Sequence, residues 1–178
     1  MIGVMLVDDD ALTLELHRGY VERLDGFEVV AECTGARAAV SALLGSPGAG
    51  EIDLVLLDMT MPDGSGLDVL RHLRARTGTV DVIAITSVRD SEVVRQVIAL
   101  GAAQYLVKPF TFSDFRDRMM QYLRFRERLS LAAGTATQAE IDAMVGALRT
   151  SPTPTLPKGL SAETLDRVSA LLRSGPAS

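Results

Sequence analysis

Cysteine, histidine and tryptophan are scarce in this sequence, which restricts the metal and redox chemistry that it can support. The single thiol, Cys33, can form no disulfide within the chain, and its place in a strand-like run indicates a small buried residue. This cysteine usage fits a reducing compartment. The two histidines, His17 and His72, lie in helical patterns at no shared spacing, so we interpret both as solvated or half-buried surface residues.

The sequence also lacks a long hydrophobic run and an excess of positive charge. No apolar stretch approaches the roughly 20 residues that cross a bilayer, and the first residues carry no basic leader, so we expect a cytoplasmic protein without membrane contact. A formal net charge of −5 argues against binding nucleic acid through bulk electrostatics. The 47% of hydrophobic residues and 23% of charged residues favour a packed core over disorder.

Short apolar runs alternate with segments of helical spacing along the first two thirds of the chain. The runs cover residues 4–7, 27–33, 54–57, 80–85 and 103–107, and the helical patterns cover 12–24, 35–44, 67–73, 93–98 and a segment from 111 or 113 to 129. Five such repeats predict parallel strands joined by right-handed crossovers. We therefore expect an α/β fold with a doubly wound, five-stranded parallel sheet and helices on both faces. Among the doubly wound strand orders, we expect the flavodoxin-like order 2-1-3-4-5.

The composition changes after residue 125, where the predicted sheet domain (1–125) ends. Thr137 and Glu140 have the capping-box spacing that opens a helix, so residues 126–150 are predicted to form a helical linker. Prolines at 152, 154 and 157 make residues 151–159 an extended spacer. Residues 160–178 carry one amphipathic helix, which cannot bury its own apolar stripe and is read as the first helix of an incomplete second domain.

Polar residues follow four of the five apolar runs: Asp8 and Asp9, Asp58, Thr86, and Lys108. The carboxyl ends of parallel strands lie at one edge of a sheet, so these groups are expected to converge there. Asp58 taken alone is a metal ligand, a nucleophile or a helix cap.

Charged carboxylates at one site repel one another unless a cation lies among them, and Mg²⁺ prefers such oxygen ligands. Lys108 adds a point charge and Thr86 a hydroxyl, both suited to phosphoryl oxygens. The group as a whole predicts phosphoryl transfer onto the Asp58 carboxylate.

Four motifs in this order resemble the receiver domain of bacterial two-component response regulators, over roughly residues 1 to 125. They are Val7-Asp8-Asp9, Leu57-Asp58-Met59-Thr60-Met61-Pro62-Asp63-Gly64, Ile85-Thr86-Ser87 and Tyr105-Leu106-Val107-Lys108-Pro109-Phe110. The four motifs together are far more specific than any one of them.

The resemblance implies a role for each matched residue. Asp58 would be the phosphoacceptor, Asp9 a direct Mg²⁺ ligand, Asp8 a ligand through water, and the Thr60 carbonyl a backbone ligand. Thr86 and Tyr105 would form the switch that reports phosphorylation on the face made by the fourth and fifth helices and strands. A sensor histidine kinase would donate the phosphoryl group, and the chain would be no enzyme apart from its own phosphorylation and dephosphorylation.

Two further segments resemble the linker of the citrate- and C4-dicarboxylate-responsive regulators: residues 138–142 and 156–161. That family carries a C-terminal helix-turn-helix domain that binds DNA and regulates transcription. The resemblance therefore implies that residues 160–178 begin a DNA-binding output domain whose DNA-reading helix lies beyond Ser178. DNA contact is expected only through that missing part.

Several acids and one aromatic residue have a structural interpretation beside the functional one. Asp10 is expected to cap the first helix, with a metal pair shifted to Asp9 and Asp10 as the alternative. Asp63 and Asp68 are expected to be turn and first-turn helix acids. Tyr105 is either ordinary core or part of the switch.

The last helix of the sheet domain carries a basic cluster and an apolar heptad. We interpret the arginines as its solvated face: Arg116, Arg118, Arg124, Arg126 and Arg128. A homodimer is the sharper hypothesis, in which Phe115, Tyr122 and Leu129, at heptad spacing, pair across two copies.

Two other functions remain open at this stage. A phosphohydrolase or phosphotransferase with an Asp nucleophile usually carries a second Asp close after the first, where this chain has Thr60. A pseudo-receiver that only binds partners would be expected to lack Asp9, Asp58 or Lys108, and this chain has all three.

Overall fold

The computed structural model describes residues 1–45, 51–76, 80–87 and 91–131. Its elements in chain order are β1 (Ile2–Val7), α1 (Ala11–Val21), β2 (Phe27–Cys33), α2 (Ala36–Gly45), β3 (Leu54–Asp58), β4 (Thr60–Met61), β5 (Gly64–Ser65), α3 (Gly66–Arg76), β6 (Asp81–Thr86), α4 (Ser91–Ala99), β7 (Gln104–Val107) and α5 (Phe112–Leu131). Five of the strands form one parallel sheet in the order β2-β1-β3-β6-β7. The predicted fold and strand order are confirmed, with β6 and β7 as the fourth and fifth strands.

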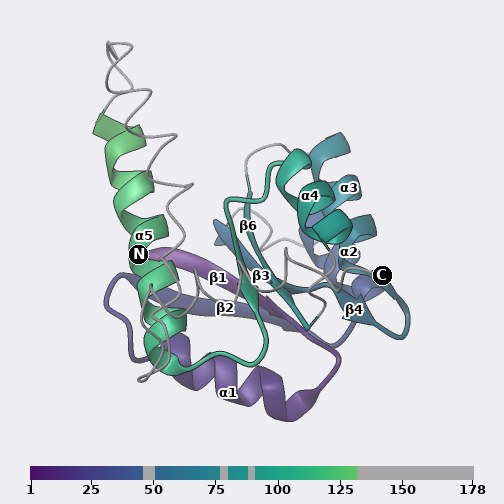
Figure 1. The fold of residues 1–178 in the computed structure, drawn as a ribbon, viewed down its shortest axis with the longest axis horizontal. Coiled ribbons are helices and arrows are strands. Elements are labelled where there is room, and N and C mark those ends of the chain that lie inside the picture. Colours follow the sequence, from purple (N-terminus) through teal and green to yellow (C-terminus); the bar gives the residue numbers. More distant parts are fainter. Residues whose placement is uncertain (46–50, 77–79, 88–90, 132–178) are drawn as a thin grey trace, which may run out of the picture. The chain divides into compact units, whose positions relative to one another are not determined.

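Successive residues of each central strand face opposite sides of the sheet, as the strand period of two requires. In β3, Leu54 and Leu56 pack into the core beneath α1 and α5. Val55 and Leu57 pack into the core beneath α2, α3 and α4. Figure 1 shows these two groups of helices on opposite faces of the sheet. Because both faces are covered, these strands are apolar along their whole length.

A small hairpin follows the sheet strand β3 and was not expected from the sequence, which indicated only a Pro/Gly turn. Strands β4 and β5 pair antiparallel, with Thr60 opposite Ser65 and Met61 opposite Gly64. The hairpin returns the chain so closely that a Cβ on Gly66 would lie 2.4 Å from the Asp58 carbonyl oxygen. Only glycine therefore lets α3 begin directly beside Asp58.

Helix α5 begins after a reciprocal cap between Thr111 and Asp114, as expected for the predicted start. Thr111 donates its backbone N–H and its hydroxyl to the Asp114 carboxylate, at 2.9 and 2.8 Å, and the Asp114 N–H donates to the Thr111 hydroxyl oxygen at 3.2 Å. Both helix-end donors are thus satisfied by side chains.

The inner face of α5 packs on the sheet, and this overturns the proposed heptad dimer. Phe115 and Tyr122 are fully buried in the core of their own chain, so they cannot pair with a second copy. The Tyr122 hydroxyl donates to Asp81 at 2.8 Å, and the Arg126 guanidinium donates to Asp53 at 3.1 Å. Arg126 is therefore an anchor of α5 on the amino end of the sheet and does not belong to a purely solvated basic face.

Part of the predicted organisation falls beyond the described residues. Helix α5 contains residues 126–131 of the predicted linker. The rest of that linker, the spacer at 151–159 and the helix within 160–178 lie outside the described residues. No helix in the part that the structure describes is long and apolar enough to span a membrane.

Candidate functional site

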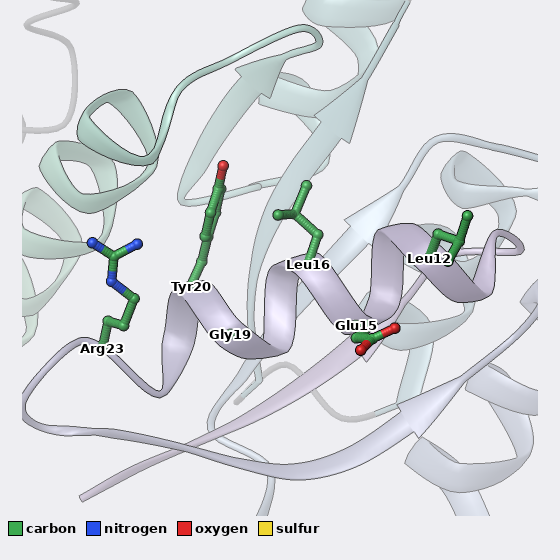
Figure 2. A pocket seen from close by; sticks show the side chains of 6 residues that line it. All are labelled: Leu12, Glu15, Leu16, Gly19, Tyr20 and Arg23. Atoms are coloured by element: carbon green, nitrogen blue, oxygen red, sulfur yellow. The ribbon is translucent and has the colours of Figure 1, made fainter.

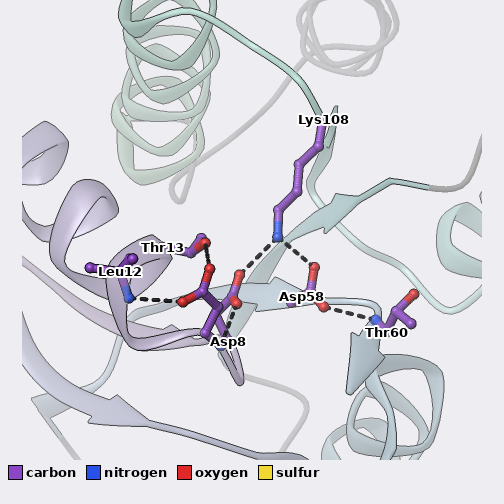
Figure 3. Close-up of polar contacts among 7 residues, drawn as sticks. Asp8, Leu12, Thr13, Asp58, Thr60 and Lys108 are labelled. Carbon is purple, nitrogen blue, oxygen red and sulfur yellow. Dashed lines mark hydrogen bonds and ion pairs between the residues drawn. The ribbon is translucent and has the colours of Figure 1, made fainter. Parts of the chain in front are cut away.

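Two buried carboxylates and one ammonium meet at the carboxyl end of the sheet. Asp8 follows β1, Asp58 ends β3 and Lys108 follows β7, so three strands that lie apart in the sequence each supply one group. The Lys108 Nζ is 2.8 Å from Asp8 Oδ2 and 2.9 Å from Asp58 Oδ1. Figure 3 shows the ammonium reaching between the two carboxylates. Asp8 and Asp58 are only 3% and 5% exposed, so this pairing takes place largely out of water.

The second oxygen of each carboxylate is held by the backbone two residues further on. The Asp10 N–H donates to Asp8 Oδ1 at 3.0 Å, and the Thr60 N–H donates to Asp58 Oδ2 at 3.0 Å. Each acid therefore has a fixed orientation, with one oxygen turned toward Lys108.

Burial and pairing shift the pKa values of the two groups that face each other. Burial raises the pKa of the Asp58 carboxyl, and the hydrogen bond and charge of Lys108 offset only part of that shift. Burial alone would lower the pKa of Lys108, but its hydrogen bonds to Asp8 and Asp58 outweigh burial and raise it. Lys108 is therefore a permanent cation at neutral pH.

Thr86 ends β6, beside β7, and its side chain is buried. Its carbonyl oxygen accepts the Lys108 N–H at 2.8 Å, so the two predicted site residues are adjacent across the sheet. Tyr105 of β7 is half-buried against the core beneath α2, α3 and α4, and the Arg118 guanidinium lies 5.7 Å from its ring centre. Tyr105 thus packs against the core, as the first of its two interpretations expected, and its role in the switch stays a prediction.

The remaining acids near the site have different fates. Asp9 is exposed beside Asp8. Asp10 caps α1, as expected, by accepting the Leu12 N–H and the Thr13 hydroxyl, both at 3.0 Å. The cap occupies both Asp10 oxygens, which leaves the alternative metal pair Asp9 and Asp10 without support.

No three acidic, histidine or cysteine side chains are gathered into a ready-made metal site within the described ranges. The donor set nevertheless fits Mg²⁺, which binds few protein oxygens and keeps several waters. Asp8 and Asp58 offer oxygens in fixed orientations, and Asp9, which follows Asp8 in the chain, is exposed.

Comparison of the sequence with models of known protein families agrees with the order of the motifs and with the geometry at the strand ends. The family model described as "Response regulator receiver domain" matches residues 4–120. The chain belongs to the response regulator receiver family. A probable C4-dicarboxylate response regulator, DctR of Priestia megaterium, is 35% identical over 169 residues, which are 95% of this chain and 72% of that relative. The transcriptional regulatory protein MalR of Bacillus subtilis is 33% identical over 175 residues, with 98% and 72% covered.

Solved receiver structures share the fold. A response regulator receiver domain protein from Clostridium thermocellum has a TM-score of 0.63 at 26% identity and covers 72% of this chain and 99% of its own. The CheY chain of a CheX-CheY-BeF3-Mg complex from Borrelia burgdorferi has a TM-score of 0.64 at 24% identity, with 68% and 89% covered. The described part of this chain therefore has the architecture of known receiver domains.

Sequence reasoning missed what Asp63 does in this receiver. It was expected to be a turn acid, yet its carboxylate also accepts the N–H groups of Ala36 at 2.9 Å and Arg37 at 3.1 Å. It thereby caps α2 from the hairpin beside Asp58, in place of Gly35, which has no side chain to do so. A Cβ on Gly35 would lie 2.6 Å from the Asp63 carboxylate. The missing signal was the absence of a capping side chain at Gly35.

The expectation for His17 is wrong, whereas that for His72 holds. His17 is 4% exposed, because it lies three positions from Leu14 and four from Val21 on the inner face of α1. That helical spacing could have revealed its burial. His72 is exposed, with Nδ1 2.7 Å from the Asp68 carbonyl oxygen. Cys33 is buried, as expected, and burial raises the pKa of its thiol.

The outer face of α1 leaves large apolar side chains in solvent. Leu12 is 74% exposed and Leu16 is 51% exposed. Figure 2 shows both on the same side of the helix as Tyr20, lining a shallow hollow of about 430 Å³ that also includes Gly19 and Arg23. The two sides of α1 thus differ sharply, with His17 turned inward and this hollow turned outward.

Proposed function

We propose that this chain receives a phosphoryl group on Asp58 from a sensor histidine kinase, within a two-component phosphorelay. The observation that carries the proposal is the Asp58 carboxylate itself. It is buried at a strand end, oriented by the Thr60 N–H and paired with the Lys108 ammonium. A carboxylate nucleophile held in this way needs no general base.

Mg²⁺ is the cofactor that these residues would hold. The ligands would be Asp8 through water, Asp9, Asp58 and the Thr60 carbonyl oxygen. When bound, Mg²⁺ supplies positive charge against the phosphoryl oxygens. Two nearly buried carboxylates against one ammonium leave a negative excess, which supports a cation at this place.

The chain's own side chains then account for the transfer. An Asp58 oxygen forms the new bond to phosphorus while the bond from phosphorus to the donor group breaks, and the donor leaves with that electron pair. Lys108 stabilises the negative oxygens of the transferred group, and the Thr86 hydroxyl donates to one of them. These three residues, Asp58, Thr86 and Lys108, are the catalytic set.

The phosphorylated state would be reported by Thr86 and Tyr105. Both lie on the sheet face beneath α4, on the neighbouring strands β6 and β7. An aspartyl phosphate carries about two negative charges in place of the single charge of the carboxylate, and this added charge would bias a two-state surface.

The output of the switch would be transcriptional. Two relatives of this chain carry the names of response or transcriptional regulators. We infer that a C-terminal DNA-binding domain, of which residues 160–178 would be the first helix, acts on the target genes. The chain performs no catalysis beyond its own phosphorylation and dephosphorylation.

Intact-mass spectrometry after incubation with acetyl phosphate and Mg²⁺ tests the proposal. We expect one phosphoryl adduct in the wild type and none in Asp58→Asn or in the presence of a chelator. Asp63→Asn serves as a control, because Asp63 is turned toward α2. A lack of adduct would favour a pseudo-receiver, and rapid consumption of acetyl phosphate without a lasting adduct would favour a phosphohydrolase.

A further inference from the structure

Five aromatic side chains fill the corner between α1 and the turn that leads from β7 into α5. This aromatic cluster consists of His17, Tyr20, Phe110, Phe112 and Phe115. The His17 ring lies nearly parallel to Phe110, with centroids 5.6 Å apart and planes at 16°, and to Phe115, at 6.3 Å and 10°. Stacked and tilted pairs at these separations are attractive beyond the area that they bury.

The cluster is directly connected to the phosphoacceptor site through the backbone. Phe110 follows Lys108 by two residues, and the Lys108 ammonium is the group that contacts Asp8 and Asp58. The Lys108 backbone is fixed on one side by the Thr86 carbonyl oxygen. On the other side, the Phe110 ring fixes the turn by packing against α1 and α5.

We propose that His17 is a positioning residue for Lys108, because its imidazole stacks on Phe110 and thereby holds the turn that presents the ammonium to Asp58. This inference rests on the proposed function of Asp58. His17 acts on Lys108 indirectly, through its stacking on Phe110. It connects α1 to the reacting end of the sheet from the inner face of that helix.

The ionisation of His17 suits this task. The pKa of His17 is lowered to about 4, mainly by burial and also by the nearby charge of Lys108, while the charge of Asp8 acts in the opposite direction. The ring is therefore neutral at physiological pH, so it stacks on the turn without placing a second cation near Lys108.

The two lysines of this chain, Lys108 and Lys158, make a direct test possible. The folded protein is labelled with a trace of an acetylating reagent, and mass spectrometry gives the labelling rate of Lys108 relative to Lys158. The variants are His17→Ala, His17→Phe, which keeps a flat ring, and Val21→Ala, a buried residue on the same helix and in the same core.

We expect His17→Ala to raise the relative labelling of Lys108 by about 2- to 10-fold, the range that corresponds to the loss of one aromatic pair. His17→Phe and Val21→Ala should leave it unchanged. Equal labelling in the wild type and His17→Ala would overturn the proposal, and so would an equal rise in Val21→Ala. If His17→Ala does not fold, Phe110→Leu removes the other ring of the stack and the same outcomes apply.

A double-mutant cycle tests whether the effect passes through Lys108. The rate of phosphoryl adduct formation from acetyl phosphate should fall roughly tenfold in His17→Ala, as small misplacements of reacting groups do. In a Lys108→Ala background the same change should have no further effect. Full additivity of the two losses would overturn the proposal.

The labelling experiment needs no phosphoryl transfer, so the two proposals can fail separately. A wild type that forms no adduct contradicts the proposed function, and the labelling ratios still decide whether His17 positions Lys108. A wild type that forms the adduct, with labelling unchanged in His17→Ala, contradicts only the role of His17.

Discussion

At the scale of single residues, two carboxylates and one ammonium lie together at the carboxyl end of the sheet, which leaves a negative excess there. Asp8 and Asp58 are almost fully buried, and Lys108 is the ammonium that both contact. Buried charges are tolerated only when they are paired and hydrogen-bonded, and here each acid has one charged and one backbone donor. The stability of the folded chain should therefore depend on Lys108.

Replacing Lys108 by Met leaves two facing carboxylates without their counter-charge. We expect the free energy of unfolding at pH 7 without Mg²⁺ to fall by about 1–3 kcal/mol, less than for a fully buried pair because Lys108 is partly exposed. In this variant the pKa of Asp58 rises further above its unfolded value. The folded state then binds more protons than the unfolded state, so lowering the pH to 5 should recover part of the loss.

Urea unfolding at pH 7 and pH 5 measures this effect. Arg71→Met, which removes an exposed ion pair with Asp68, is the matched control and should change little at either pH. An unchanged unfolding midpoint for Lys108→Met at pH 7 would show that the charges are not coupled to folding.

His17 should make the protein sensitive to mild acid. Its pKa is about 4 in the folded state and 6.5 in the unfolded chain, so the unfolded state binds more protons between these values. Stability is therefore fully present above pH 6.5 and decreases as the pH falls toward 4, by at most roughly 3 kcal/mol. His17→Phe should flatten that part of the profile. Urea unfolding midpoints of the wild type and of His17→Phe, measured from pH 4 to pH 7, test this prediction. Parallel pH profiles for the wild type and the variant would contradict it.

At the scale of elements, the hairpin that follows β3 contacts the start of α2 through the Asp63 side chain. Asp63→Ala removes the acceptor of the Ala36 and Arg37 N–H groups. We expect amide exchange at the first turn of α2 to accelerate by roughly an order of magnitude, because a helix start without a cap opens more often. Hydrogen exchange measured by mass spectrometry gives the result. The control is Asp68→Ala, in the first turn of α3, which should not change amide exchange in α2. Unchanged exchange in Asp63→Ala would show that this cap does not stabilise the start of α2.

The elements show where sequence patterns suffice and where they fail. The alternation of apolar runs and helical spacing predicted the parallel sheet and the convergence of Asp8, Asp58, Thr86 and Lys108, because the carboxyl ends of parallel strands meet at one edge. The strand order was predicted correctly too, but by likeness to the flavodoxin-like fold, since the alternation alone is compatible with other doubly wound orders. The strands β4 and β5 are two residues long, too short for any periodic signal.

The heptad of α5 was misleading for another reason. A spacing of seven describes the core face of any surface helix as well as a dimer seam, and only the packing of Phe115 and Tyr122 on the sheet separates the two. The absence of a shared spacing between His17 and His72 suggested surface residues, whereas the spacing of His17 from Leu14 and Val21 places it on the inner face of α1.

At the scale of the whole molecule, one sheet serves two hydrophobic cores. Leu56 and Leu57 are neighbours on β3, both at most 1% exposed, and they pack into opposite cores. If a central strand separates from one core, its alternate side chains are withdrawn from the other core as well. The sheet domain should therefore unfold as one unit.

Leu56→Ala and Leu57→Ala test this shared dependence. Each should lower the free energy of unfolding by about 2–5 kcal/mol, the cost of a cavity in a packed core. Because the chain contains no tryptophan, urea unfolding is followed by tyrosine fluorescence and far-ultraviolet circular dichroism. The two signals should change at the same urea concentration in both variants. Separate transitions in either one would mean that the cores unfold independently.

The order of the strands also has a consequence for synthesis of the chain. Lys108 lies 100 residues after Asp8 and 50 after Asp58, and it directly follows β7, which pairs with β6 at the edge of the described sheet. A chain growing from the ribosome therefore contains Asp8 and Asp58 long before Lys108, the residue that pairs with both of them. Contacts of such long range form late, so in a nascent or partly opened chain the two acids are without their lysine. The two carboxylates acquire their ammonium partner only when β7 has paired with β6.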